Sequence, residues 1–177
     1  GQAAGNPRGG VRQDIAYAGR LLVSSAVDLD RLIQGGTLRV WFTNRQGRNL
    51  ADFALGTSTG VQEIYSPQGW HLSVLSYEQT LFDGRLDLEA GRTPANISFF
   101  SSPLCGYLQT NSACGSPTFL FKTSNLTYFP PSSWGARVKA QLSDRGYVHV
   151  GVYEVNPDRT RPGATGLEWS VKNATGV

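Results

Sequence analysis

Residues 75–91, with the sequence LSYEQTLFDGRLDLEAG, decide the fold because they describe two alternating segments joined by a tight turn. Asp83-Gly84 predicts a β-hairpin, since a type I′ turn needs a positive φ at both of its central residues. That turn sets the pairing of the two strands, so that Glu78 faces Glu89. One face of the hairpin is then apolar, and the other face carries Ser76, Glu78, Thr80, Asp87 and Glu89.

The same alternation of apolar and polar residues recurs on both sides of this hairpin. Upstream of it, Leu38, Val40 and Phe42 alternate with polar or aromatic neighbours, which is the period of a half-buried strand. Together these patterns predict antiparallel strands at 15–27, 37–46, 70–82, 85–92, 135–143 and 147–155.

A second hairpin is predicted near the C-terminal end of the sequence. Its turn is Asp144-Arg145-Gly146, which we interpret as a three-residue loop with Gly146 in the left-handed conformation. This loop pairs Val138 with Val152 and keeps the apolar residues of both strands on one face.

Long loops separate these strands and alternate with the short turns. The segments 1–13, 47–69, 93–133 and 156–176 are rich in glycine, proline and polar residues and are predicted to be loops. Outer-membrane barrels combine short periplasmic turns with longer extracellular loops. A soluble β-sandwich also has strands with one apolar and one polar face, so the pattern alone leaves both architectures open.

The composition fits an all-β protein. Charged residues make up only 16% of the chain, aromatic residues 11%, and glycine occurs 21 times. The net charge is +3 and the basic residues are dispersed, so nothing indicates nucleic-acid binding. No apolar run approaches the length of about 18 residues that a transmembrane helix needs.

Two cysteines lie in a segment rich in glycine, serine and proline. The spacing of Cys105 and Cys114 allows a disulfide within the loop, which an oxidising compartment would favour; two free thiols are the alternative. His71 and His149 do not form a metal-ligand pattern with them, so we expect no metal and no cofactor.

Several stretches resemble the OprB-type carbohydrate-selective porins. The most specific is the run from Tyr77 to Arg92. Shorter matches are Gly5-Asn6-Pro7, Tyr17–Leu21, Gly36-Thr37-Leu38, Gly47–Leu50 and the stretch Thr165–Val177. The resemblance implies an antiparallel transmembrane β-barrel of about 16 strands in the bacterial outer membrane. We therefore expect residues 1–177 to form one partial porin β-barrel domain, truncated at both ends, that supplies part of the barrel wall.

The function implied by this resemblance is passive diffusion of mono- or oligosaccharides through a polar, charged lumen, without catalysis. The other implied partners are membrane lipid and lipopolysaccharide, and the implied assembly is a monomer or a homotrimer. The first alternative is a soluble β-sandwich that binds carbohydrate. The second is a glycosidase that uses Glu78 and Glu89 as its carboxylate pair.

Residues on the polar strand faces are the candidates for the lumen. They offer the hydrogen-bond donors and acceptors that sugar hydroxyls need, although each could instead only brace the wall. Arg39, Arg45 and Glu78 are the candidates for a constriction, and Glu78 opposite Glu89 calls for a nearby arginine. The candidate set is Arg39, Trp41, Arg45, Glu78, Asp87, Glu89, Arg137, Lys139 and His149, with Arg20, Gln141 and Tyr153 on the same faces. The residues expected to face lipid are Leu38, Val40, Phe42, Tyr77, Leu86, Leu88, Val138, Val148, Val150 and Val152.

Overall fold

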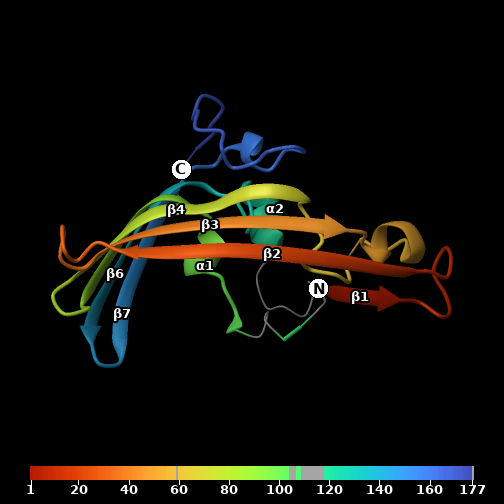
Figure 1. The fold of residues 1–177 in the computed structure, drawn as a ribbon, viewed down its shortest axis with the longest axis horizontal. Coiled ribbons are helices and arrows are strands. Elements are labelled where there is room, and N and C mark those ends of the chain that lie inside the picture. Colours follow the sequence, from red (N-terminus) through yellow and green to blue (C-terminus); the bar gives the residue numbers. More distant parts are fainter. Residues whose placement is uncertain (59, 104–106, 109–117, 177) are drawn as a thin grey trace.

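A computed structural model describes residues 1–58, 60–103, 107–108 and 118–176 of the chain. These residues form one antiparallel sheet of seven strands, whose order in space follows their order in the chain (Figure 1). The strands are β1 (Gln2–Gly5), β2 (Ile15–Asp28), β3 (Gly36–Gly47), β4 (Gly69–Leu81), β5 (Leu86–Thr93), β6 (Ser133–Ser143) and β7 (Gly146–Tyr153).

All six predicted strands are present, and their ends lie within two residues of the predicted ends. The prediction of a loop over residues 1–13 was wrong for its first part, because Gln2–Gly5 pairs with Ile15–Ala18 of β2. The four residues of β1 are small or polar and show no alternation of apolar and polar side chains. Their strand conformation comes from the ladder of hydrogen bonds that the neighbouring strand offers.

The hairpin of β4 and β5 has the predicted register, with Glu78 opposite Glu89. Asp83 has a φ of 54° and Gly84 a φ of 85°, so both central residues of the turn lie in the left-handed region. Phe82 joins them with a φ of 54°, which the sequence pattern did not predict. The tight turn keeps the apolar and charged faces of the two strands aligned.

The hairpin of β6 and β7 differs from its predicted register by two residues. Val138 pairs with Val150, not with Val152, and Ser143 pairs with Gly146. The turn therefore has two residues, and an irregularity between Gln141 and Ser143 takes up the extra residue. Gly146 does not have a positive φ, so the predicted loop type was wrong. A shift of two residues leaves every side chain on its predicted face.

The short turns gather at one end of the sheet and the long connections at the other. Figure 1 shows the β2–β3, β4–β5 and β6–β7 turns together on the left and the β1–β2 connection at the far right. In the described part of the chain, the helices within the segments predicted to be loops are all short. They are a π-helical turn η1 (Ala51–Leu55), α1 (Ala95–Ser98), α2 (Thr118–Ser124) and a 3₁₀ turn η4 (Pro157–Arg159).

The two faces of the sheet have different surroundings. The sheet curves around α1 and α2, which lie on its polar side (Figure 1). On the opposite side the valines of β7 are open, with Val150 and Val152 each 60% exposed. We call the side that faces α1 and α2 the inward face, and the apolar side the outward face. Register and exposure put the predicted lipid-facing set on the outward face and the charged set on the inward face.

A β-sandwich needs two sheets packed against each other. The described residues form a single curved sheet, with a large apolar face that nothing in the described part of the chain covers along β7. The alternative of a soluble sandwich is therefore wrong for this architecture.

Candidate functional site

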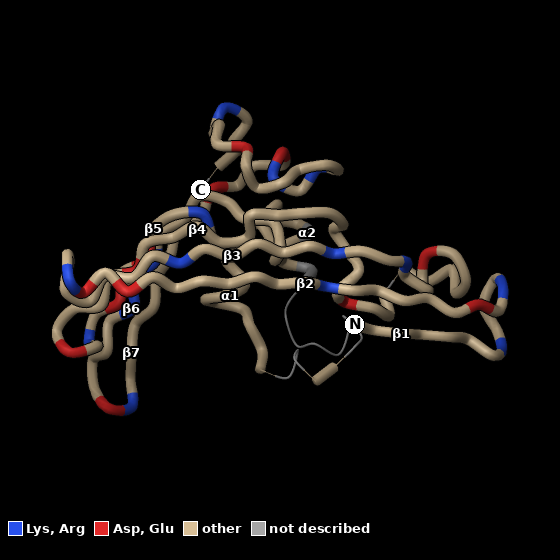
Figure 2. The backbone as a smooth tube through the Cα atoms, in the orientation of Figure 1, with Lys and Arg blue, Asp and Glu red and all other residues tan. Residues whose placement is uncertain are grey.

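Two glutamates and two arginines on four adjacent strands lie in contact on the inward face. Arg137 Nε lies 2.5 Å from Glu89 Oε2, and Arg137 Nη2 lies 2.7 Å from Glu78 Oε1. Arg39 Nη1 lies 3.6 Å from Glu78 Oε2 and 3.7 Å from Glu89 Oε1. We call these four residues the charge quartet. Figure 2 shows charged residues of both signs gathered over this part of β3–β7.

The charge quartet neutralises two carboxylates, and one of them, that of Glu89, has almost no access to water. Only 1% of the Glu89 side chain and 10% of the Arg137 side chain are exposed. Two carboxylates directly opposite each other destabilise a strand pair, and the two guanidinium groups bring the net charge of the quartet to zero. Ser76 Oγ also donates a hydrogen bond of 2.7 Å to Glu89 Oε1. The expectation that a nearby arginine relieves the repulsion is confirmed.

The polar surface continues from the quartet toward the short-turn end of the sheet. Asp87 pairs across the ladder with Lys139, so opposite charges again face each other. Thr80 Oγ1 donates to Asp87 Oδ1 at 3.1 Å, and Lys139 Nζ lies 4.9 Å from the centre of the Tyr147 ring. This region presents donors and acceptors in alternation and no extended patch of one charge.

Arg45 lies on the inward face of β3 but is enclosed, with 1% of the residue exposed. Its Nη1 donates to the backbone carbonyl of Ser66 and, at 3.5 Å, to that of Glu63. The guanidinium also lies 5.5 Å from the centre of the Phe129 ring. Its Nε and Nη2 have no hydrogen-bond partner in the described part of the chain. Arg45 therefore holds the segment 60–68 against the inward face, whereas Arg39 and Glu78 remain partly exposed.

The described parts of the connection between β5 and β6 also pack onto the inward face. The imidazole of His149 stacks on Phe99, with 4.1 Å between ring centres and 20° between planes. Tyr153 meets the same ring edge-on at 6.0 Å. Ala95 of α1, Phe121 of α2 and Tyr153 of β7 form a buried cluster. His149 is thus an anchor for this connection, and its inward position agrees with the sequence pattern.

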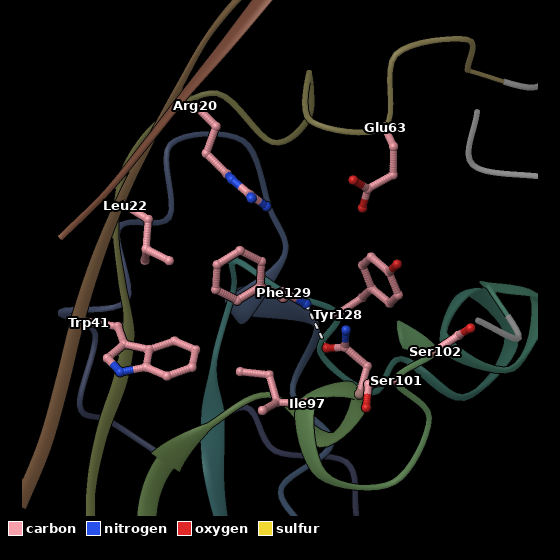
Figure 3. Close-up of a pocket in the computed structure, with 10 residues that line it drawn as sticks. Arg20, Leu22, Trp41, Glu63, Ile97, Ser101, Ser102, Tyr128 and Phe129 are labelled. Atoms are coloured by element: carbon pink, nitrogen blue, oxygen red, sulfur yellow. Dashed lines mark hydrogen bonds between the residues drawn. The ribbon is translucent and has the colours of Figure 1, made fainter. Parts of the chain in front are cut away.

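A cavity of about 320 Å³ lies between the inward face and these inward-packed segments. Arg20, Leu22 and Trp41 border it from β2 and β3, and Glu63, Tyr128 and Phe129 border it from the loops (Figure 3). Asn96, Ile97, Ser101 and Ser102 complete its lining.

Sequence reasoning placed Arg20 and Trp41 on this face but missed the loop residues of the cavity. A loop has no periodicity that assigns its side chains to a face. Two pairs of adjacent aromatic residues in the loop, Phe99-Phe100 and Tyr128-Phe129, are a sequence signal for ordered packing.

A further arginine that the sequence pattern did not single out lies on the outward side. Arg92 is in register with Leu75 and is fully buried. Its Nη1 donates to the Glu168 carbonyl at 2.6 Å, and its Nη2 donates to the Ser132 carbonyl at 2.7 Å. It also lies 5.8 Å from the Trp169 ring centre. The segment after η4 thus covers this charge at the long-loop end of the sheet.

Glu154, directly after β7, organises that covering segment. Arg159 Nη2 lies 2.8 Å from Glu154 Oε1, Asn156 Nδ2 donates to the same oxygen at 2.8 Å, and the Trp134 N–H donates to Oε2 at 3.2 Å. Burial alone would raise the pKa of Glu154. The hydrogen bonds from Arg159, Asn156 and Trp134, together with the charge of Arg159, outweigh burial and lower this pKa below its ordinary value.

The predicted disulfide between Cys105 and Cys114 lies outside the described residues. Among the residues that the structure describes, no three His, Cys, Asp or Glu side chains are grouped as metal ligands would be. In that same part of the chain, no helix has the length and apolar character to cross a membrane.

Comparisons with known proteins agree with this architecture. The profile of the carbohydrate-selective porins of the OprB family matches residues 12–177. Porin B of Pseudomonas aeruginosa is 32% identical over 173 residues, which cover 92% of this chain and 38% of Porin B. The putative porin QuiX of Acinetobacter baylyi is 28% identical over 188 residues, which cover 99% of this chain and 42% of QuiX.

A solved structure gives the same answer for the fold. The high-pH structure of Pseudomonas putida OprB superposes with a TM-score of 0.87 at 27% identity, covering 97% of this chain and 43% of that protein. The chain thus spans about two fifths of the length of these relatives. The strand register, the polar inward face and the family match lead to one conclusion: the chain belongs to the OprB family of carbohydrate-selective porins, proteins of the bacterial outer membrane.

Proposed function

We propose that the full-length protein is a passive outer-membrane channel for mono- or oligosaccharides, and that this chain forms part of its wall. The observation that carries the proposal is the opposition of the two sheet faces. One face exposes valines such as Val150 and Val152, and the other carries the charge quartet and the inward-packed loops. A barrel in lipid needs an apolar exterior around a polar lumen.

The inward residues suit a neutral and hydroxyl-rich solute. Arginine supplies donors in a fixed geometry, and carboxylates supply acceptors. Because the charges alternate in sign, the wall attracts neither cations nor anions over a long distance. We propose that the partly exposed quartet members Arg39 and Glu78 line the lumen. Trp41, Asp87, Lys139 and His149 extend this surface, and the buried Glu89, Arg137 and Arg45 hold it in shape.

Liposome swelling tests the channel directly. Vesicles that contain the full-length protein should swell in iso-osmotic glucose faster than protein-free vesicles, and the rate should fall as the sugar becomes larger. Glu78→Ala should change the sugar flux by altering the exposed lumen, and Arg45→Ala should change it by releasing the segment 60–68. Swelling no faster than in protein-free vesicles would contradict the channel. Wild-type flux in both variants would contradict the assignment of these residues.

The two carboxylates of the charge quartet do not support hydrolysis. Glu78 and Glu89 are both bound by Arg137, and the Glu89 side chain is only 1% exposed, so neither is poised as an acid or a nucleophile for a sugar. Release of monosaccharide from an oligosaccharide by the purified protein would favour the glycosidase alternative.

The outward face is the surface that we assign to the membrane. Its apolar side chains would contact lipid, and the long-loop end would lie among lipopolysaccharide, since outer-membrane barrels carry their longer loops outside the cell. The assembly is a monomer or a homotrimer. Cross-linking in native membranes, followed by electrophoresis, distinguishes the two.

A further inference from the structure

We propose that a groove on the outward face, at the long-loop end of the sheet, binds the head group of one lipopolysaccharide molecule. This inference rests on the proposed assignment of the outward face to the membrane and adds a defined site to that face. The groove has a volume of about 520 Å³. Tyr17 borders it from β2 and Trp70 from β4, and Gly19 of β2 and Asn44 and Gln46 of β3 also line it.

The strand register puts the groove at the outer edge of the lipid-facing surface. Asn44 is in register with Leu21 and Trp70, and both of these side chains are 54% exposed on the outward side. The next outward pair toward the middle of the sheet, Val23 and Phe42, is apolar. The groove therefore lies where the apolar band ends, at the depth of lipid head groups. Because the long loops of outer-membrane barrels lie outside the cell, these head groups belong to the outer leaflet, which consists of lipopolysaccharide.

Asn44 is a polar side chain for which the described part of the chain supplies no hydrogen-bond partner. The residue is only 7% exposed, and no hydrogen bond among the described residues involves its side-chain amide. Burying an amide without a partner costs free energy, so a ligand that bonds to it is favoured. The head group of lipopolysaccharide, lipid A, is a phosphorylated glucosamine disaccharide with N-acyl amides and hydroxyl groups. Both groups can pair with the amide of Asn44 and with that of the exposed Gln46, whereas an acyl chain cannot.

Gly19 opens the groove between the larger side chains of β2. Gly19 does not have a positive φ, so the backbone does not require glycine at this position. A Cβ atom there would lie 3.4 Å from the Tyr17 ring, and a longer side chain would extend into the space beside Gln46, its partner in register. Glycine within a strand often marks a place where a ligand approaches closely. The ring of Trp70 on the other side offers an apolar surface at the level of the head groups.

The charges around the groove suit a phosphorylated head group. Among the described residues that line it, none is an aspartate or a glutamate. Arg20 borders the groove along β2, but its side chain lies in the cavity on the inward face (Figure 3). The first charged residue beyond β3 is the exposed Arg48, whose backbone N–H donates to the Tyr17 carbonyl at 2.9 Å. A phosphate group therefore meets a cation at the rim and no carboxylate in the groove.

The test titrates purified lipid A into the full-length protein in detergent micelles and measures the bound lipid by native mass spectrometry. Asn44→Leu keeps the volume and removes the amide, so it should raise the apparent Kd about 5-fold, the factor expected for one hydrogen bond. Gly19→Val fills the groove and should raise the Kd about 10-fold or more. The matched control is Ser25→Val, which should keep the wild-type Kd. It adds the same side chain to the same face of β2, at an exposed position in register with Val40.

A second measurement separates loss of binding from loss of folding. Without lipid A, Asn44→Leu should unfold at the same urea concentration as wild type or at a higher one, because the protein itself leaves the amide without a partner. A lower midpoint would show that the folded protein bonds this amide, and it would overturn the argument for a ligand.

Three binding results would also overturn the site. The first is a wild-type Kd for lipid A in both Asn44→Leu and Gly19→Val. The second is equally tight binding of phosphatidylethanolamine with the same loss in both variants, which would identify a general phospholipid site. The third is a protein dimer that Gly19→Val abolishes, which would identify an interface between two copies.

Glucose flux into phosphatidylcholine vesicles tests the proposed function separately. Both variants should keep the wild-type flux, since the groove lies outside the lumen. Absent flux in the wild type, with lipid A still bound, would contradict the channel alone. Normal flux with lipid A binding that neither substitution changes would contradict the lipopolysaccharide site alone.

Discussion

Replacing Arg137 by methionine removes the two shortest contacts of the charge quartet and keeps most of the volume of the side chain. Arg137 holds Glu89 at 2.5 Å and Glu78 at 2.7 Å, whereas Arg39 stays beyond 3.5 Å from both and forms no hydrogen bond with either. Breaking a buried ion pair by removing one partner costs about 3–5 kcal/mol. Because Arg39 still compensates part of the charge, we expect Arg137→Met to cost about 3 kcal/mol, and Arg39→Met about 1 kcal/mol.

The assay is reversible urea unfolding of the full-length protein in lipid vesicles, followed by tryptophan fluorescence. A matched control is Arg145→Met, since Arg145 lies in the exposed β6–β7 turn and should change stability by no more than about 0.5 kcal/mol. The double variant Glu89→Gln with Arg137→Met has no buried carboxylate at position 89 opposite Glu78. Its loss in free energy of unfolding should therefore be smaller than the sum of the losses in the two single variants. Equal stability of Arg137→Met and Arg145→Met would refute the reasoning.

Three further results are expected. The pKa of Glu154 in the folded protein lies below its ordinary value of 4.5. Its ion pair with Arg159 therefore contributes its full stability above about pH 4.5. This contribution is lost as the pH falls through the lowered pKa of the folded protein. The protection factors for hydrogen exchange over the segment 154–176 should therefore fall in acid, and in Glu154→Gln they should already be low at neutral pH. Val150→Arg should destabilise the protein in vesicles by about 2–4 kcal/mol if Val150 lies near the bilayer midplane, whereas the conservative Val150→Ile should not. Arg45→Met should make the segment 60–68 cleavable by external protease in intact cells, and a cleavage rate equal to that of wild type would show that other contacts hold this loop.

The strands could be predicted from the sequence because their two faces differ so strongly in polarity. Leu38, Val40 and Phe42 alternate with polar neighbours, and Asp83-Gly84 fixes a register that the structure confirms. The β1 strand could not be predicted, because its four small or polar residues have no alternation and its conformation is imposed by β2. Local propensity loses to tertiary context in such short segments.

The residues of the site also differ in how well the sequence predicts them, according to whether they lie in regular strands or in loops. Arg39, Glu78 and Glu89 could be assigned to one face because they lie in regular strands. The loop side of the cavity could not be assigned, since Glu63 and Phe129 reach it through the irregular segments that Arg45 and the α1–α2 region hold in place. For Arg92, which lies in a regular strand, the sequence pattern did not predict the burial of the side chain. Its position on an apolar face gives no hint in the sequence of the loop carbonyls that bury it.

The charge quartet also specifies the register of the strands, which the alternation of apolar and polar residues does not do alone. If a strand slides by two residues, each side chain stays on its own face, so a lipid-exposed sheet has little polarity cost with which to reject the slipped pairing. That is the displacement by which the predicted β6–β7 pairing differs from the real one. If β3 slipped by two residues against β4, Arg39 would move away from Glu78 and Glu89. If β6 slipped in the same way against β5, Arg137 would move away from them. The two carboxylates would then face each other with less compensation or none. The four charges therefore favour one strand register among several that would present the same apolar face to lipid.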